Sequence, residues 1–257
     1  MQHLKLEGVV LRVVDYGDAD RVVSLLTAER GKVSAFARGA RASRRRFGGA
    51  LEPFTLLALE ARERGGSDLL ALDAVQVLRG FGGIRADLAR IACAGYACEL
   101  ARELVRDAEP HPELLEILVR YLGRLDAAAA RPVELRGFEL AALAAVGLMP
   151  RLSGCARCGA AVEGDERVAF DPSEGGLLCG RCGAPPPAAL RLSGAAVTAL
   201  RRLQRGTAES PGDGDPAALA GVGAELRHAL SCFIEHHLGR RLASRKFLDE
   251  IGPLLGP

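Results

Sequence analysis

The sequence contains no tryptophan, only three tyrosines and eight phenylalanines among 257 residues, and no long uncharged run. Its hydrophobic core must therefore be largely aliphatic. The longest uncharged stretch, residues 140–150, is much shorter than the roughly 20 apolar residues of a membrane-spanning helix. Arg12 interrupts the N-terminal apolar run, which is not typical of a signal peptide. We therefore expect neither membrane insertion nor secretion.

Catalytic and nucleotide-binding motifs are also absent. The chain has no G-x-x-x-x-G-K-[ST] phosphate loop, no H-E-x-x-H, no G-x-S-x-G and no G-x-G-x-x-G. Its five histidines are scattered, apart from His236 and His237, which as neighbours on a helix would point about 100° apart. Because no pattern pairs an acid with a base or a nucleophile with its base, we interpret the chain as a binding protein and not an enzyme.

Charge is nearly balanced overall, at +2, but it is unevenly distributed. Residues 1–50 hold ten Lys or Arg against five Asp or Glu, whereas residues 81–150 hold eight against ten. This asymmetry indicates that the N-terminal part of the chain meets a polyanion.

The first eighty residues predict β-structure. Five runs rich in Val, Leu or aromatic residues, separated by turn-forming residues, cover Leu4–Tyr16, Arg21–Thr27, Lys32–Arg38, Pro53–Arg62 and Asp68–Leu78. Five short strands without a helical pattern between them suit a small closed or partly open barrel.

Beyond the predicted barrel the hydrophobic pattern becomes helical. Helices are expected from Ile84 onward, with an apolar stripe that includes Leu88 and Leu104, from Pro112, from Pro132, over 188–204, and from the end of a polar loop at 205–216 to about Leu238. We predict an α+β multidomain chain with a barrel domain at 1–80, a helical domain in two parts at 81–150 and 184–257, and a small module inserted at 151–183.

Two C-x-x-C pairs are the strongest chemical signal. They are Cys155–Cys158 and Cys179–Cys182, each followed by glycine, with twenty residues between the pairs. Two residues between thiolates let a tight turn direct both sulfurs at one cation, and this spacing is typical of a structural zinc site. We predict one structural Zn²⁺ in a closed shell of Cys155, Cys158, Cys179 and Cys182.

Other interpretations of the cysteines are two disulfides or a redox pair. Disulfides are not expected without a secretion signal, and a redox pair would not need a matched partner. The remaining cysteines, Cys93, Cys98 and Cys232, lie in apolar helical stretches and are expected to be small buried core residues.

The segment 38–46 carries five arginines in nine positions and no acid. It lies between two predicted strands, and concentrated guanidinium on an exposed loop attracts phosphate by charge and by bidentate hydrogen bonds. The alternative is a solvated loop that binds nothing.

The strand before this segment favours binding. Alternation puts Val33, Ala35 and Ala37 on one face of the strand and Phe36 and Arg38 on the other. If the small apolar face packs inward, a ring and a cation face outward, as in sites that hold single-stranded nucleic acid. A one-residue slip would put Phe36 in the core instead. We predict that nucleic acid contacts Phe36, Arg38, Arg41, Arg44, Arg45 and Arg46.

Short motifs along nearly the whole chain match one known family. They are the four-cysteine insert and the stretches Glu7–Leu11, Tyr16–Arg21, Thr27–Lys32, Ala37–Arg41, Leu51–Phe54 and Ser244–Leu248. Together they resemble the RecO family of bacterial DNA repair proteins.

That resemblance implies an OB-fold barrel at the N-terminus, a helical domain and a zinc-binding module. It implies binding of single- and double-stranded DNA, annealing of complementary strands and, together with RecR, help in loading RecA onto single strands covered by single-strand-binding protein (SSB). It also implies the acidic C-terminal tail of SSB as a partner, and a cytoplasmic location at the nucleoid. The competing hypothesis is a zinc-ribbon scaffold that binds proteins and uses its arginines only for solubility.

Overall fold

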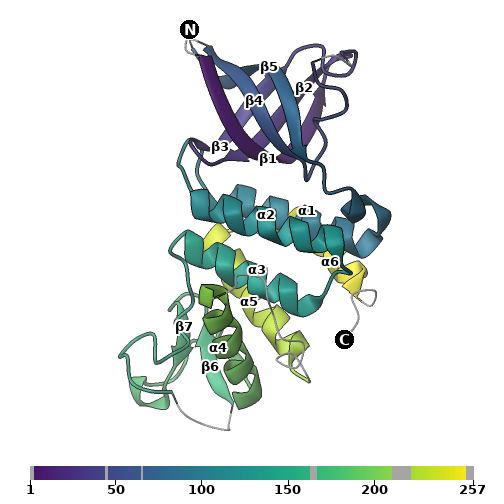
Figure 1. The fold of residues 1–257 in the computed structure, drawn as a ribbon. Coiled ribbons are helices and arrows are strands. Elements are labelled where there is room, and N and C mark those ends of the chain that lie inside the picture. Colours follow the sequence, from purple (N-terminus) through teal and green to yellow (C-terminus); the bar gives the residue numbers. More distant parts are fainter. Residues whose placement is uncertain (1–2, 44–45, 65, 163–166, 210–220, 253–257) are drawn as a thin grey trace. The chain divides into compact units, whose positions relative to one another are not determined.

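A computed structural model describes residues 3–43, 46–64, 66–162, 167–209 and 221–252 of the chain (Figure 1). Five strands come first: β1 (His3–Tyr16), β2 (Asp20–Thr27), β3 (Gly31–Ala37), β4 (Leu56–Arg64) and β5 (Ser67–Arg79). The five predicted strands are therefore confirmed, and their ends differ from the predicted ones by three residues or fewer.

These strands close into a barrel in the order β1-β2-β3-β5-β4 (Figure 1). Neighbouring strands are antiparallel except β3 and β5, which are parallel. The predicted barrel is confirmed and is OB-like. Because the sheet closes on itself, it leaves no long free edge.

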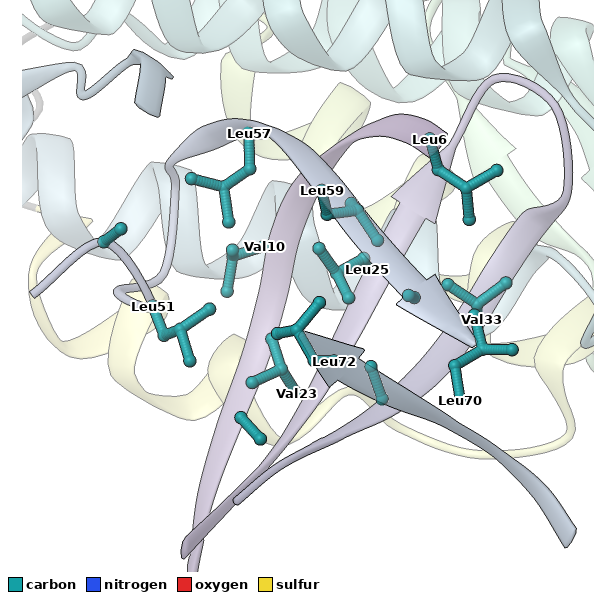
Figure 2. Packing of buried hydrophobic residues seen from close by; sticks show 14 of the residues in the cluster. Leu6, Val10, Val23, Leu25, Val33, Leu51, Leu57, Leu59, Leu70 and Leu72 are labelled. Carbon is teal, nitrogen blue, oxygen red and sulfur yellow. The ribbon is translucent and has the colours of Figure 1, made fainter. Parts of the chain in front are cut away.

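An aliphatic cluster fills the barrel, as Figure 2 shows. Its members come from all five strands and from the segment before β4, and include Leu6, Val10, Val23, Leu25, Leu51, Leu57, Leu59 and Leu72. Val33, Ala35 and Ala37 belong to this cluster, whereas Phe36 is only half-buried and Arg38 is exposed. The predicted register of β3 is therefore confirmed.

The helices are α1 (Leu88–Leu104), α2 (Pro112–Ala127), α3 (Pro132–Ala145), α4 (Gly194–Glu209), α5 (Gly223–Leu238) and α6 (Ala243–Glu250), with a short 3₁₀ helix, η1 (Gly82–Ala86), before α1. Both α2 and α3 begin with the proline predicted to start them, because the fixed φ of proline suits the first helical turn. Among the described residues, no helix has the length and apolar character needed to cross a membrane.

The helix predicted over 188–204 begins and ends later in the structure. Residues 190–192 form a strand, and α4 begins only at Gly194 and continues to Glu209, into the predicted loop at 205–216. Part of that predicted loop, residues 210–216, lies outside the described residues.

A small second sheet, which was not predicted from the sequence, lies next to the cysteine pairs. It consists of β6 (Val168–Asp171), β7 (Gly176–Leu178) and β8 (Leu190–Leu192), in the order β7-β6-β8, with all pairs antiparallel; a 3₁₀ turn, η2 (Gly180–Cys182), follows β7. On one face of this sheet the Phe170 ring packs against Phe233 of α5, with ring centroids 5.9 Å apart. The inserted module therefore shares a core with a helix.

The chain forms two compact units. The first contains the barrel, α1, α2 and α6, in residues 1–129 and 244–251, and the second contains α3, α4, α5, the small sheet and the four cysteines, in residues 130–243 and 252–257. The domain boundaries predicted at 80, 150 and 183 stay predictions.

Within the first unit, polar contacts join the barrel to the segments that follow it. The Lys32 ammonium of β3 donates to the Arg102 carbonyl of α1 at 3.1 Å and pairs with Asp107 at 3.2 Å. The Arg85 guanidinium of η1 donates to the Pro53 carbonyl, just before β4, at 3.0 Å. These bonds hold the barrel against its own helices.

Candidate nucleic-acid interface and metal site

The loop after β3, which carries the predicted arginines, is attached to the barrel at several points. The backbone N–H of Gly39 donates to Asp20 Oδ1 at 2.7 Å, and the N–H of Arg41 donates to the Ala19 carbonyl at 3.0 Å. Further along, the Phe47 ring is buried in the barrel core. The described part of the loop is therefore held in place against the turn that joins β1 to β2.

Three of the five predicted arginines, Arg38, Arg41 and Arg46, lie in the described part of the loop and are exposed. None of them forms an ion pair with a carboxylate of the described residues. The Arg46 guanidinium donates to the Arg38 carbonyl at 2.7 Å and lies 5.0 Å from the centroid of the Phe47 ring. Arg44 and Arg45 lie outside the described residues. Arg38 and Arg41 therefore keep positive charge that no described acid neutralises, whereas Arg46, in addition to the hydrogen bond from Arg62, helps to lower the pKa of Asp73.

An aromatic pair lies at the same end of the barrel. The rings of Tyr16, at the end of β1, and Phe36, in β3, meet edge to face with centroids 5.7 Å apart, and Tyr16 is 62% exposed. In the strand register Tyr16 is opposite Asp20, which also accepts the bond from Gly39. We call Tyr16, Phe36, Arg38, Arg41 and Arg46 the aromatic–arginine face.

Tyr16 was not predicted as a site residue, because in the sequence it stands out only as part of a turn motif. Alternation in β1 nevertheless puts it on the same side of the strand as Val14. Val14 is 42% exposed, and it pairs with Val22, which pairs in turn with Phe36. The register of β1 shifts between Val10 and Arg12, so strict alternation from the buried Leu4, Leu6 and Val10 would have placed Tyr16 in the core, and the sequence gives no signal for this shift.

Two acidic residues close to this face already have partners. Asp15 accepts a hydrogen bond from Arg21 at 3.0 Å, and Asp20 accepts the bond from Gly39. Their negative charge is therefore partly offset. An exposed ring at the same end of the barrel as exposed arginines can stack on a base while the cations hold the phosphates.

The structure brings the four predicted cysteines together in the second unit. Their sulfur atoms all lie within 4.8 Å of one another, with Cys155 3.9 Å from Cys182, and Cys179 3.6 Å from both Cys158 and Cys182. A tetrahedral cation about 2.3 Å from each sulfur would hold neighbouring sulfurs about 3.8 Å apart. The donor set thus fits a metal ion, and the sulfurs are too far apart for disulfide bonds, which span about 2.05 Å.

Local backbone geometry explains how the cysteine turns form. Gly159 and Gly183, one after each pair, have φ of 72° and 90°, in the left-handed region that glycine adopts without strain. The first turn is closed by the Gly159 N–H, which donates to the Cys155 carbonyl at 2.9 Å. Glycine after each pair therefore lets the backbone leave the turn without strain.

The thiols of the cluster differ in how readily they ionise. Donation from the Cys179 backbone N–H lowers the pKa of Cys155 to about 6, so this thiol ionises readily. The neighbouring thiols raise the pKa of Cys182 to about 12 because they accept from its protonated form. A cation at the centre would stabilise all four as thiolates.

The other cysteines differ from one another. Cys93 and Cys98 are buried as predicted, and burial raises the pKa of Cys98 to about 12, which keeps that thiol neutral. Cys232 is only half-buried and lies 3.8 Å from Nδ1 of His228, one helical turn earlier in α5. The prediction that Cys232 is a core residue is therefore wrong, because it lies at the edge of the buried face of α5.

Comparison with known proteins gives a consistent result along the chain. The family model described as recombination protein O N terminal matches residues 1–81, and the one described as recombination protein O C terminal matches residues 85–246. Proteins named DNA repair protein RecO are similar over nearly their whole length. The one from Anaeromyxobacter dehalogenans strain 2CP-C is 67% identical over 256 residues, covering 100% of both chains. The one from Myxococcus xanthus is 47% identical over 252 residues, covering 98% of this chain and 99% of its own.

Proposed function

The chain belongs to the RecO family of DNA repair proteins, and from this premise we propose that it acts in DNA repair by binding DNA on the aromatic–arginine face of its barrel. The supporting observation is that Arg38, Arg41 and Arg46 are exposed and form no ion pair with a described carboxylate, on a loop whose backbone is bonded to the turn that follows Tyr16. Phosphates would lie on the guanidinium groups and an unstacked base on the ring. Such contacts are indifferent to base sequence.

We propose further that the protein binds both single- and double-stranded DNA and anneals complementary strands without catalysis. Binding by charge and stacking needs no ATP, and strands would be exchanged by mass action. Loading of RecA together with RecR, and contact with the acidic tail of SSB, are proposed because of family membership.

The metal proposed for the four cysteines is zinc. Four thiolates in a tetrahedral, closed arrangement are typical of structural Zn²⁺, which when bound would hold the two cysteine turns together and leave no position for a reactive water. Elemental analysis of the purified protein should find about one zinc per chain, since four thiolates bind one ion. Protein that is folded at 151–183 but contains no metal would contradict the proposal.

The salt dependence of DNA binding tests the proposed function. Each phosphate neutralised on a single strand contributes about −0.7 to the slope of log affinity against log salt. Three arginines therefore predict a slope of about −2 or steeper for a labelled single-stranded oligonucleotide, and Arg38→Ala, Arg41→Ala and Arg46→Ala together should flatten it by about 2.

A matched control removes three exposed arginines elsewhere in the first unit, with Arg64→Ala, Arg106→Ala and Arg120→Ala. Because it loses the same charge but none of the proposed contacts, it should keep most of the salt slope of the unmodified protein. A flat salt curve for the unmodified protein, or equal losses in both triple variants, would support the protein-binding scaffold instead.

A further inference from the structure

A hollow lies beside the cysteine cluster, on the face of the small sheet opposite to Phe170. In the strand register Leu178 of β7 and Arg191 of β8 both pair with Ala169 of β6, so their side chains share one face. Ala169 and Leu178 are buried and line the hollow together with Pro185. Its volume is about 670 Å³, in the range of about 300–1,000 Å³ that holds small organic ligands.

The charged residues among those that line the hollow are all arginines: Arg167, Arg181 and Arg191. All three are exposed, and none forms an ion pair with a carboxylate of the described residues. They come from three separate segments, before β6, in η2 and in β8. Three cations that line one hollow repel one another. An anionic ligand between them would relieve that repulsion.

The cysteine cluster fixes one of these arginines. Arg181 lies between Cys179 and Cys182, whose sulfurs are 3.6 Å apart, so closing the cluster determines where the Arg181 backbone lies. The cysteine cluster therefore sets the position of one edge of the hollow.

An apolar floor and a cationic rim together match a nucleotide. The flat base is apolar on its faces, and its phosphates form bidentate hydrogen bonds with guanidinium. A single strand can turn one base into a hollow, whereas a duplex keeps its bases stacked and paired. The chemistry of the hollow thus favours an unpaired strand.

We propose that this hollow is a second binding site for single-stranded nucleic acid, on a different unit from the aromatic–arginine face. One base would lie against Pro185, above the buried Ala169 and Leu178, with the flanking phosphates on Arg167, Arg181 and Arg191. With two such sites, one chain can hold two strands at once. The second site does not depend on the first, because no residue is common to both.

Counting bound strands tests the proposal. The full-length, metal-loaded protein is titrated at low salt with an oligothymidylate of about eight nucleotides, which is short enough to occupy one site, given about 4–16 nucleotides for other single-strand sites. Native mass spectrometry should detect two strands per chain. Arg167→Ala, Arg181→Ala and Arg191→Ala together should reduce the count to one, and Arg38→Ala, Arg41→Ala and Arg46→Ala should remove the other strand.

The two triple variants separate this proposal from the proposed function. If the barrel site does not exist, the barrel variant binds as the unmodified protein does, and the hollow variant alone loses a strand. If the hollow variant keeps both strands with unchanged affinity, the second site is overturned. It is also overturned if that variant keeps both strands but loses binding of an acidic peptide, because the hollow would then be a protein-binding site.

Two further variants exclude misfolding as an explanation. Arg191→Glu changes one exposed residue of β8. It should lower the affinity for the second strand at least tenfold, while the zinc content stays at one per chain. The sequence between Val162 and Arg167 contains three carboxylates. Replacing them together, with Glu163→Gln, Asp165→Asn and Glu166→Gln, removes negative charge next to Arg167 in the sequence and should increase the affinity for the second strand. Weaker binding in this amide variant would overturn the proposal.

Discussion

The two arginine-bearing surfaces of the chain are built in different ways. The arginines of the barrel loop follow one another within nine residues, whereas Arg167, Arg181 and Arg191 come from three segments and meet only in the folded structure. The first kind of surface can be found from a sequence, and the second kind cannot. A search for charge runs therefore finds the first kind of surface and misses the second.

The structural elements that support the two surfaces also differ. The barrel loop is attached to a closed sheet with an aliphatic cluster from five strands. The strands around the hollow are only three or four residues long, and the turns next to them depend on four cysteines. We expect the barrel to be stable by its own core, and the cysteine module to depend on its metal.

Among the variants that test this difference, Cys179→Ser should have the largest effect. Structural zinc contributes about 10–16 kcal/mol to the folding of isolated zinc-finger peptides, so losing one ligand should cost several kcal/mol locally even though Phe170 also packs on α5. Hydrogen exchange should speed up by orders of magnitude in residues 152–183, while the amides of β1 to β5 stay protected.

The control for this variant is Cys232→Ser, which changes a cysteine outside the cluster and should leave zinc content and exchange unchanged. Equal protection of residues 152–183 in both variants would show that the second unit does not need the metal.

Tyr16→Ala tests the barrel surface with an intermediate effect. Stacking on one aromatic ring is worth about 1–3 kcal/mol per base, so affinity for a single strand should fall roughly five- to a hundredfold. Because Tyr16 is 62% exposed, thermal stability should change little. Tyr16→Phe keeps the ring and should bind normally; a loss as large as that of alanine would assign the effect to the hydroxyl group and not to stacking.

Most of the barrel could be predicted from the sequence because its strands alternate over seven or more residues and end at turn-forming residues. Alternation also predicted the register of β3 correctly, and with it the outward direction of Phe36. Cysteine spacing identified the four ligands because a C-x-x-C turn is a local structure.

The small sheet and the hollow could not be predicted for the opposite reason. Strands of three or four residues are too short to show a period, so the pattern at Leu190–Leu192 cannot be told from the start of the helix that follows. Neither Arg181 nor Arg191 has a charged neighbour in the sequence that would mark it. Only the pairing of β6 with β7 and β8 places them around one floor.

Asp73→Asn, on the barrel, is the smallest of the expected effects. The Arg62 guanidinium forms two hydrogen bonds of 2.7 Å with Asp73 and lowers the pKa of that carboxyl. A lowered pKa in the folded state means that the pair stabilises the protein above the unfolded pKa of about 3.9, and that this contribution is lost as the pH falls through the folded pKa.

The variant should therefore lower Tm by at most a few degrees at pH 7, and the difference should shrink as the pH falls below about 4. Glu60→Gln, which removes only the exposed pair with Lys5, should change Tm less. A Tm difference for Asp73→Asn that grows as the pH falls would contradict the expected pH dependence of this stabilisation.

The location of DNA on the barrel is the central claim, and photo-crosslinking measures it most directly. A single-stranded oligonucleotide carrying photoreactive thymidine analogues is crosslinked to the full-length protein, and the attached peptides are identified by mass spectrometry. We predict crosslinks in the peptides that contain Tyr16, Phe36 and residues 38–46, with weaker ones around Arg191. Crosslinks confined to the second unit, with none on β1, β3 or the loop after β3, would contradict the account.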